Sequence, residues 1–143
     1  MNKPFDQKIY DQDDPIAKAA VQAYLERRFH PWWAMTMPED FGPDIAWFPR
    51  GGKAWWIEAE RKHGWNRNLF PFDTLHIPFR KERLIEYAPI TFYVVSMNLR
   101  WAMTVEGADL FRCLPPIHKK TIYTDDEEFY SVPLKLCRLE EIG

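Results

Sequence analysis

The fold is decided by residues 43–62, which read PDIAWFPRGGKAWWIEAERK. Two runs rich in β-forming residues, Asp44–Phe48 and Lys53–Arg61, are predicted as strands because aromatic and β-branched side chains suit a pleated surface. The four residues between them, 49–52 (Pro-Arg-Gly-Gly), are typical of a hairpin turn. We therefore expect an antiparallel hairpin at the centre of the fold.

Charged side chains gather at the open end of this hairpin. Asp44 begins the first strand, and Glu58 and Glu60 lie about as far beyond the turn as Asp44 lies before it. Because side chains alternate between the two faces of a strand, Glu58, Glu60 and Lys62 share one face. Carboxylates held together cost free energy unless they are neutralised, and Mg²⁺ prefers carboxylate oxygens. The hairpin therefore predicts a site for a divalent cation.

The rest of the chain alternates helical and strand patterns around this hairpin. A helix is expected over residues 14–29, with Asp13 or Asp14 as the N-cap and Pro15 in the first turn. Its predicted apolar face is formed by Ile16, Ala19, Ala20, Ala23 and Tyr24. The other predicted elements are a β-prone run (32–37), a short strand (74–77), a helix (80–88), a central strand (90–96), a strand (100–105) and a short helix (107–111). The order α-β-β-β-α-β, followed by further strands, predicts a mixed α/β (α+β) fold.

Two motifs in this order resemble a known family. Pro43-Asp44, followed after 15 residues by Glu60-Arg61-Lys62, resembles the signature of the PD-(D/E)XK nucleases. The element order over about residues 14–96 is similar to the restriction-endonuclease-like core of that superfamily. We therefore expect one domain over residues 1–143, with this core followed by a C-terminal β extension over about 97–143.

The resemblance implies catalytic and metal-binding roles in two alternative registers. In the first, Asp44 and Glu60 bind Mg²⁺ or Mn²⁺, and Lys62 assists the attacking water. In the second, Asp44 and Glu58 bind the metal, and Glu60 takes the place of the family's lysine. The apolar strand that leads up to Glu58 slightly favours Glu58 as the principal second ligand. Glu26, on the first helix, is a weaker candidate because this helix sometimes adds an acidic ligand in the superfamily.

The distribution of charge is compatible with a polyanionic partner, although charge alone favours an ordinary solvated surface. The whole chain has a formal net charge of −2, but residues 50–83 carry eight basic and four acidic side chains. Such a stretch can attract a nucleic acid even when the whole chain is nearly neutral. Nucleic acid, with DNA favoured, is therefore the expected substrate. The candidate substrate contacts are Arg61, His63, Arg67, Arg80 and Lys81.

Composition limits the class of protein. The chain has 143 residues, of which 46% are hydrophobic, so it can bury a core, and no apolar run approaches the length of a membrane span. Two cysteines without metal-ligand spacing indicate reduced thiols, and we expect a cytoplasmic protein. The expected function is metal-dependent hydrolysis of phosphodiester bonds, with a homodimer or a protein partner supplying specificity. The alternative is a non-catalytic binding module with the same fold.

Overall fold

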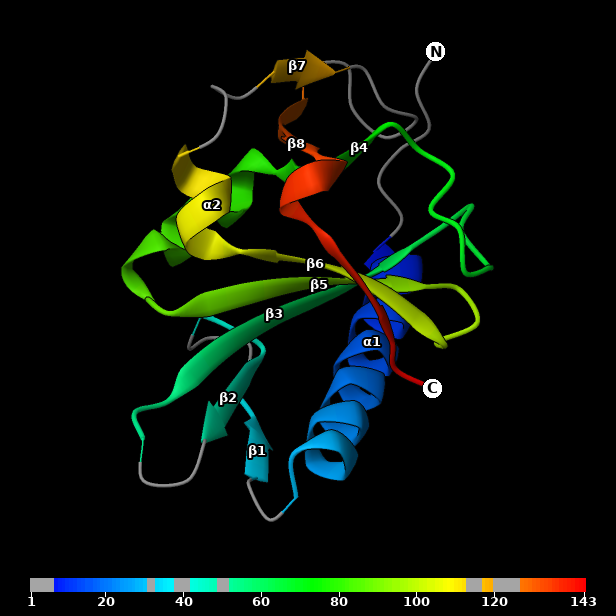
Figure 1. Cartoon of the computed structure of the whole chain (residues 1–143). Helices are drawn as coiled ribbons and strands as arrows, with labels where there is room; N and C mark the ends of the chain where they lie inside the picture. The colour runs from blue at the N-terminus through cyan, green and yellow to red at the C-terminus, as the bar shows by residue number, and fades with distance from the viewer. Residues whose placement is uncertain (1–6, 31–32, 38–41, 49–51, 113–116, 120–126) are drawn as a thin grey trace.

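The computed structural model describes residues 7–30, 33–37, 42–48, 52–112, 117–119 and 127–143 (Figure 1). Over these residues the chain is a mixed α/β structure with a six-stranded sheet, a three-stranded sheet and two α-helices. None of the helices in these ranges combines the length and the apolar character needed to cross a bilayer.

The elements follow one another in a simple order. They are α1 (Gln7–Arg28), β1 (Trp33–Thr36), β2 (Ile45–Phe48), β3 (Trp55–Lys62), β4 (Thr74–Pro78), the 3₁₀ helix η2 (Phe79–Glu86), β5 (Ile90–Ser96), β6 (Trp101–Glu106), α2 (Gly107–Arg112), β7 (Ile117–Lys119), β8 (Glu127–Pro133), the 3₁₀ turn η3 (Leu134–Leu136) and β9 (Arg138–Glu141). The strands predicted from the sequence agree with β2 to β6 to within two residues at each end. Trp32 and turn residues 49–51 lie outside the described residues.

The larger sheet has the strand order β1-β2-β3-β5-β6-β9. The hairpin is confirmed, because β2 pairs antiparallel with β3 in the register Ile45↔Ile57. β5 then pairs parallel with β3, after a crossover through β4 and η2. Every residue of β5 is buried, as expected for a central strand. The second sheet has the order β4-β8-β7, so β4 pairs with the C-terminal part of the chain.

Alternating side chains of the larger sheet supply two separate hydrophobic cores. On one face, Ile57 and Ala59 pack with Val21 and Leu25 of α1. On the other face, the core contains Phe92 and Val94 of β5, Leu84 of η2, and residues of β4 and β8. α1 and η2 therefore cover opposite faces of the sheet.

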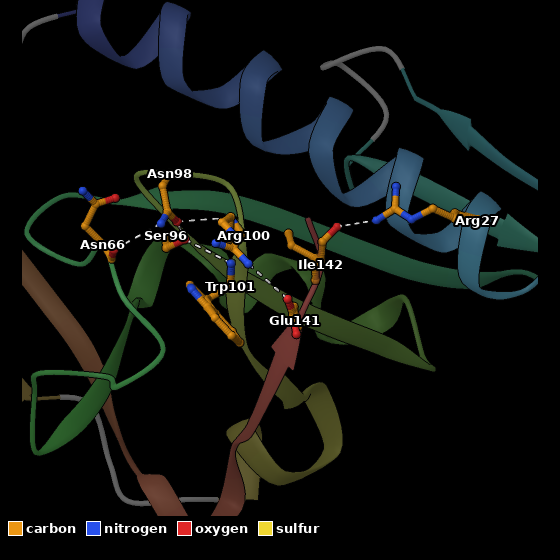
Figure 2. Close-up of polar contacts among 8 residues, drawn as sticks. All are labelled: Arg27, Asn66, Ser96, Asn98, Arg100, Trp101, Glu141 and Ile142. Atoms are coloured by element: carbon orange, nitrogen blue, oxygen red, sulfur yellow. Dashed lines mark hydrogen bonds and ion pairs between the residues drawn. The ribbon is translucent and has the colours of Figure 1, made fainter.

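The C-terminal residues contact both β6 and the end of α1. β9 pairs antiparallel with β6. Arg100 forms an ion pair with Glu141 (Nη2–Oε1, 3.4 Å), and an Arg27 Nη2 donates to the carbonyl of Ile142 at 2.6 Å (Figure 2). The last strand thus links the end of α1 to the edge of the sheet.

The predicted start of the first helix is wrong, and its predicted apolar face is wrong in part. α1 begins at Gln7, so Pro15 lies inside the helix and not in its first turn. The buried face carries Ala17, Val21 and Leu25 together with the predicted Tyr24, and Ala20 packs against the same core, whereas Ile16, Ala19 and Ala23 are exposed. Alanine side chains are small enough to be accommodated on either face of a helix. The larger Val21 and Leu25 therefore determine which face of α1 is buried.

The segment predicted as an α-helix over residues 80–88 is a 3₁₀ helix, η2. Pro78, Lys81 and Leu84 are buried at intervals of three residues. This spacing matches the three residues per turn of a 3₁₀ helix, which aligns side chains at i and i+3. The sequence signalled a helix but not its tighter winding.

Candidate functional site

Asp44 lies beside Glu58, as the hairpin predicted. Continuing the register Ile45↔Ile57 by one residue places Asp44 opposite Glu58. Its carboxylate Oδ2 accepts a hydrogen bond from the backbone N–H of Ala59 at 2.8 Å. This bond joins the end of β2 to the middle of β3. Asp44 and Glu58 are only 8% and 4% exposed, so the two acidic groups form a buried pair.

Two lysines neutralise this pair from opposite faces of the sheet. Lys18 of α1 places its Nζ 3.2 Å from Asp44 Oδ1. Lys81 of η2 places its Nζ 2.6 Å from Glu58 Oε2. Both lysines are 7% exposed. A buried charge without a partner is strongly destabilising, so each lysine is a structural requirement of the carboxylate it meets.

Burial sets the proton affinity of Glu58. It raises the pKa of this carboxyl from 4.5 to about 8, because a charge is poorly solvated there. Lys81 opposes this effect, and the neighbouring Asp44 reinforces it. Burial lowers the pKa of Lys81, but Glu58, Glu60 and Asp44 act in the opposite direction and the net pKa is raised. Lys81 therefore remains an ammonium ion at neutral pH.

One carboxylate oxygen of this cluster remains open. Within the described part of the chain, Glu58 Oε1 is buried and has no hydrogen-bond partner. Such an atom is costly to bury, and it calls for a proton or a ligand. Glu60 follows on the same face of β3, is partly buried, and acts electrostatically on Lys81. The described residues contain no group of three or more His, Cys, Asp or Glu side chains arranged to hold a metal ion.

Lys62, predicted to assist the attacking water, lies farther along β3. It is four residues beyond Glu58, which separates their Cα atoms by about 13 Å at the usual rise of a strand. Its Nζ lies 4.9 Å from the centre of the Phe72 ring. The ammonium group that contacts Glu58 belongs to Lys81, which the sequence suggested only as a phosphate contact.

The other predicted substrate contacts are dispersed. A guanidinium nitrogen of Arg61 donates to the carbonyl of Met97 at 2.5 Å, so this side chain braces the turn after β5. His63 and Arg67 are exposed in the loop that follows β3. The side chain of Arg80 lies outside the described residues.

A polar network fixes this loop to the end of β5 (Figure 2). Ser96 Oγ donates to Asn98 Oδ1 at 2.6 Å and accepts from the backbone N–H of Trp101 at 3.1 Å. The amide of Asn98 in turn donates to the carbonyl of Asn66 at 3.1 Å. The loop that carries His63 and Arg67 is therefore anchored beside the carboxyl ends of β3 and β5.

Lys18 was not expected from the sequence, whereas Glu26 of the same helix was a candidate ligand. Glu26 is exposed and accepts a hydrogen bond from the side chain of Gln22 at 3.2 Å, so α1 directs it elsewhere. Lys18 precedes Val21 by three residues and Leu25 by seven, so it lies on the buried face of the helix. A lysine at an apolar position of an amphipathic helix was the signal that could have identified it.

Comparison of the chain with family models, with curated proteins and with solved structures gives no match.

Proposed function

We propose that this protein is a metal-dependent nuclease that hydrolyses phosphodiester bonds, with DNA as the favoured substrate. The observation that carries the proposal is the buried Asp44–Glu58 pair, in which Glu58 Oε1 has no hydrogen-bond partner among the described residues. Two buried carboxylates with an open oxygen and an adjacent ammonium group have the chemistry of a phosphoryl-transfer site.

The strand topology supports the same proposal. The elements α1, β1, β2, β3, η2 and β5 follow the α-β-β-β-α-β order that the resemblance to the PD-(D/E)XK nucleases implied, with β4 added and a 3₁₀ helix in place of the second α-helix. The residues favour the register with Asp44 and Glu58, since these two side chains are the buried pair. Glu60 then takes the position of the family's lysine, and Lys81 supplies the positive charge.

The residues present fit Mg²⁺ or Mn²⁺. Mg²⁺ is usually bound by one or two protein carboxylates and keeps several waters, so a site without a third carboxylate is sufficient. Asp44 and Glu58 would hold the ion, with Glu60 close to them. A bound ion would lower the pKa of a water molecule and offset the charge that develops on the phosphate.

The chain's own residues have separate tasks in such a site. The raised pKa of Lys81 keeps this group charged, so it stabilises negative charge and does not act as a base. Burial raises the pKa of Glu58, so a bound cation would compete with a proton for this carboxylate. Lys18 holds Asp44 in place by an ion pair from the other face of the sheet.

The proposal is tested by cation binding and cleavage together. Mn²⁺ binding is measured by calorimetry, and cleavage is measured on duplex, single-stranded and branched DNA and on RNA. Asp44→Asn and Glu58→Gln should abolish both Mn²⁺ binding and cleavage. Glu26→Gln, which removes an exposed carboxylate on α1, should leave both unchanged. A folded wild-type protein that neither binds Mn²⁺ nor cuts any of these substrates would overturn the proposal.

A second candidate is a non-catalytic module with the same fold that binds nucleic acid or protein. It is favoured by Lys18 and Lys81, which already neutralise the two carboxylates within the chain. Binding of labelled DNA without Mn²⁺, measured by fluorescence anisotropy and unaffected by Glu58→Gln, would support this module over the nuclease.

A further inference from the structure

A cavity of 630 Å³ opens at the end of the larger sheet where β5 begins and β6 ends. Its walls are mainly apolar and include Trp55, Pro89, Ile90 and Phe111. In Figure 1, α1 crosses the opposite end of β3 and β5, and α2 lies beside the end of β6. The volume is within the range of about 300–1,000 Å³ that is common for small-molecule sites.

This cavity is separate from the carboxylate pair. Trp55 and Glu58 are three residues apart on β3, so their side chains are on opposite faces of the sheet. The cavity lies at the end of the sheet and is lined from both faces, because Trp55 packs against the core beneath α1 whereas Ile90 and Phe111 pack with the other core, on the Glu58 face. Asp44 and Glu58 are not among the described residues that line it. The cavity is therefore a second candidate binding site, distinct from the proposed nuclease site.

A hydrogen-bonded chain fixes one acidic group at the cavity. The indole N–H of Trp55 donates to Thr91 Oγ1 at 2.8 Å, and this hydroxyl donates to Glu106 Oε2 at 3.0 Å. The three side chains come from β3, β5 and β6, and Thr91 is the register partner of Glu106. Burial raises the pKa of Glu106 above its usual value, and the hydrogen bond that Thr91 donates opposes this shift and holds the carboxylate in one orientation. This is a preorganised acceptor at the edge of an apolar cavity.

The charge of the lining selects the ligand. Glu106 and Asp109 line the cavity, and among the lining residues that the structure describes there is no lysine, arginine or histidine. The charge of Asp109 raises the pKa of Glu106, so both carboxylates contribute negative charge to the cavity. Arg138 on β9 also acts on Glu106 but does not line the cavity. The lining therefore favours a cationic group and disfavours an anionic one such as a phosphate.

We propose that this cavity binds a small molecule with an apolar, preferably aromatic, body and a protonated amine. The aromatic body packs among Trp55, Pro89 and Phe111. The ammonium group meets the carboxylates of Glu106 and Asp109, where an adjacent indole face can add a cation–π contribution. The chemical class is an arylalkylammonium ion.

Three probes of nearly equal shape test the proposal. 3-Phenylpropylamine carries a positive charge, 3-phenylpropan-1-ol is neutral and 3-phenylpropionate is negative. Their binding is measured by calorimetry, and amide NMR shifts at Gly107 and Ala108 report the site. The amine should bind about fivefold more tightly than the alcohol, as expected for a partly exposed ion pair, and the acid should bind most weakly.

Variants separate charge from shape. Glu106→Gln keeps the acceptor for Thr91 but removes the charge, so it should lower the affinity of the amine to that of the alcohol. Ala108→Leu narrows the cavity and should weaken both ligands. Glu141→Gln, an exposed carboxylate on β9, is the matched control and should change neither. Equal binding of the acid and the amine, no binding by the folded protein, or an amine affinity unaffected by Glu106→Gln would each overturn the proposal.

Discussion

Replacing Glu58 with glutamine should change how the stability of the protein depends on pH. In the unfolded chain this carboxyl ionises near its ordinary pKa of 4.5, whereas in the folded protein it holds its proton up to about pH 8. Between these values the folded state binds more protons than the unfolded state, so stability falls as the pH rises. The slope approaches about 1.4 kcal/mol per pH unit, and the whole window amounts to about 5 kcal/mol. Glutamine resembles the protonated carboxyl and removes this slope.

The measurement is urea unfolding followed by tryptophan fluorescence from pH 5 to pH 9. EDTA is included, because a bound cation would require an ionised Glu58. The wild-type protein should lose stability relative to Glu58→Gln as the pH rises, while Glu26→Gln should follow the wild-type curve. Parallel curves for the wild type and Glu58→Gln would refute the reasoning. A wild-type stability that rises relative to the variant would show that the ion pair with Lys81 outweighs the cost of burial.

Substitutions of Lys18 and Gly42, each with its own control, test the packing around the site. Lys18→Met leaves Asp44 buried without its ammonium partner and should cost about 3–5 kcal/mol in urea unfolding at pH 7. Arg100→Met, which breaks an exposed ion pair, should cost less than about 1 kcal/mol, and equal losses would contradict the role of burial. Gly42→Ala should cost about 1–3 kcal/mol, because Gly42 has φ of +93° and a Cβ there would lie 2.9 Å from the Tyr87 ring. Thermal unfolding measures this loss, and Tyr87→Leu should restore part of it unless the clash is not its cause.

The central hairpin and the strand over residues 90–96 could be predicted because their signals are local. Aromatic and β-branched residues mark the strands, and a Gly-Gly pair marks the turn between them. Counting from that turn was enough to place Asp44 beside Glu58, as the structure confirms. The choice between Glu58 and Glu60 needed burial as well, which a pattern of alternating residues does not provide.

The remaining parts of the site depend on contacts between distant segments. Lys18 of α1 and Lys81 of η2 form ion pairs with the two carboxylates. No short sequence pattern predicts which acidic side chain each lysine contacts. The pairing of β4 with β8 joins residues more than 50 positions apart and could not be predicted for the same reason. The winding of η2 was missed because its three-residue burial period becomes visible only in the folded chain.

The two outer strands of the larger sheet limit how copies of this protein can associate. β1 and β9 are each only four residues long. β9 reads Arg138-Leu139-Glu140-Glu141, so it presents charged side chains along the open edge of the sheet. Short, charged edges resist the addition of a strand from a neighbouring molecule and so protect against edge-to-edge aggregation. The charged side chains of β9 therefore disfavour extension of the larger sheet at that edge by a second copy of the chain.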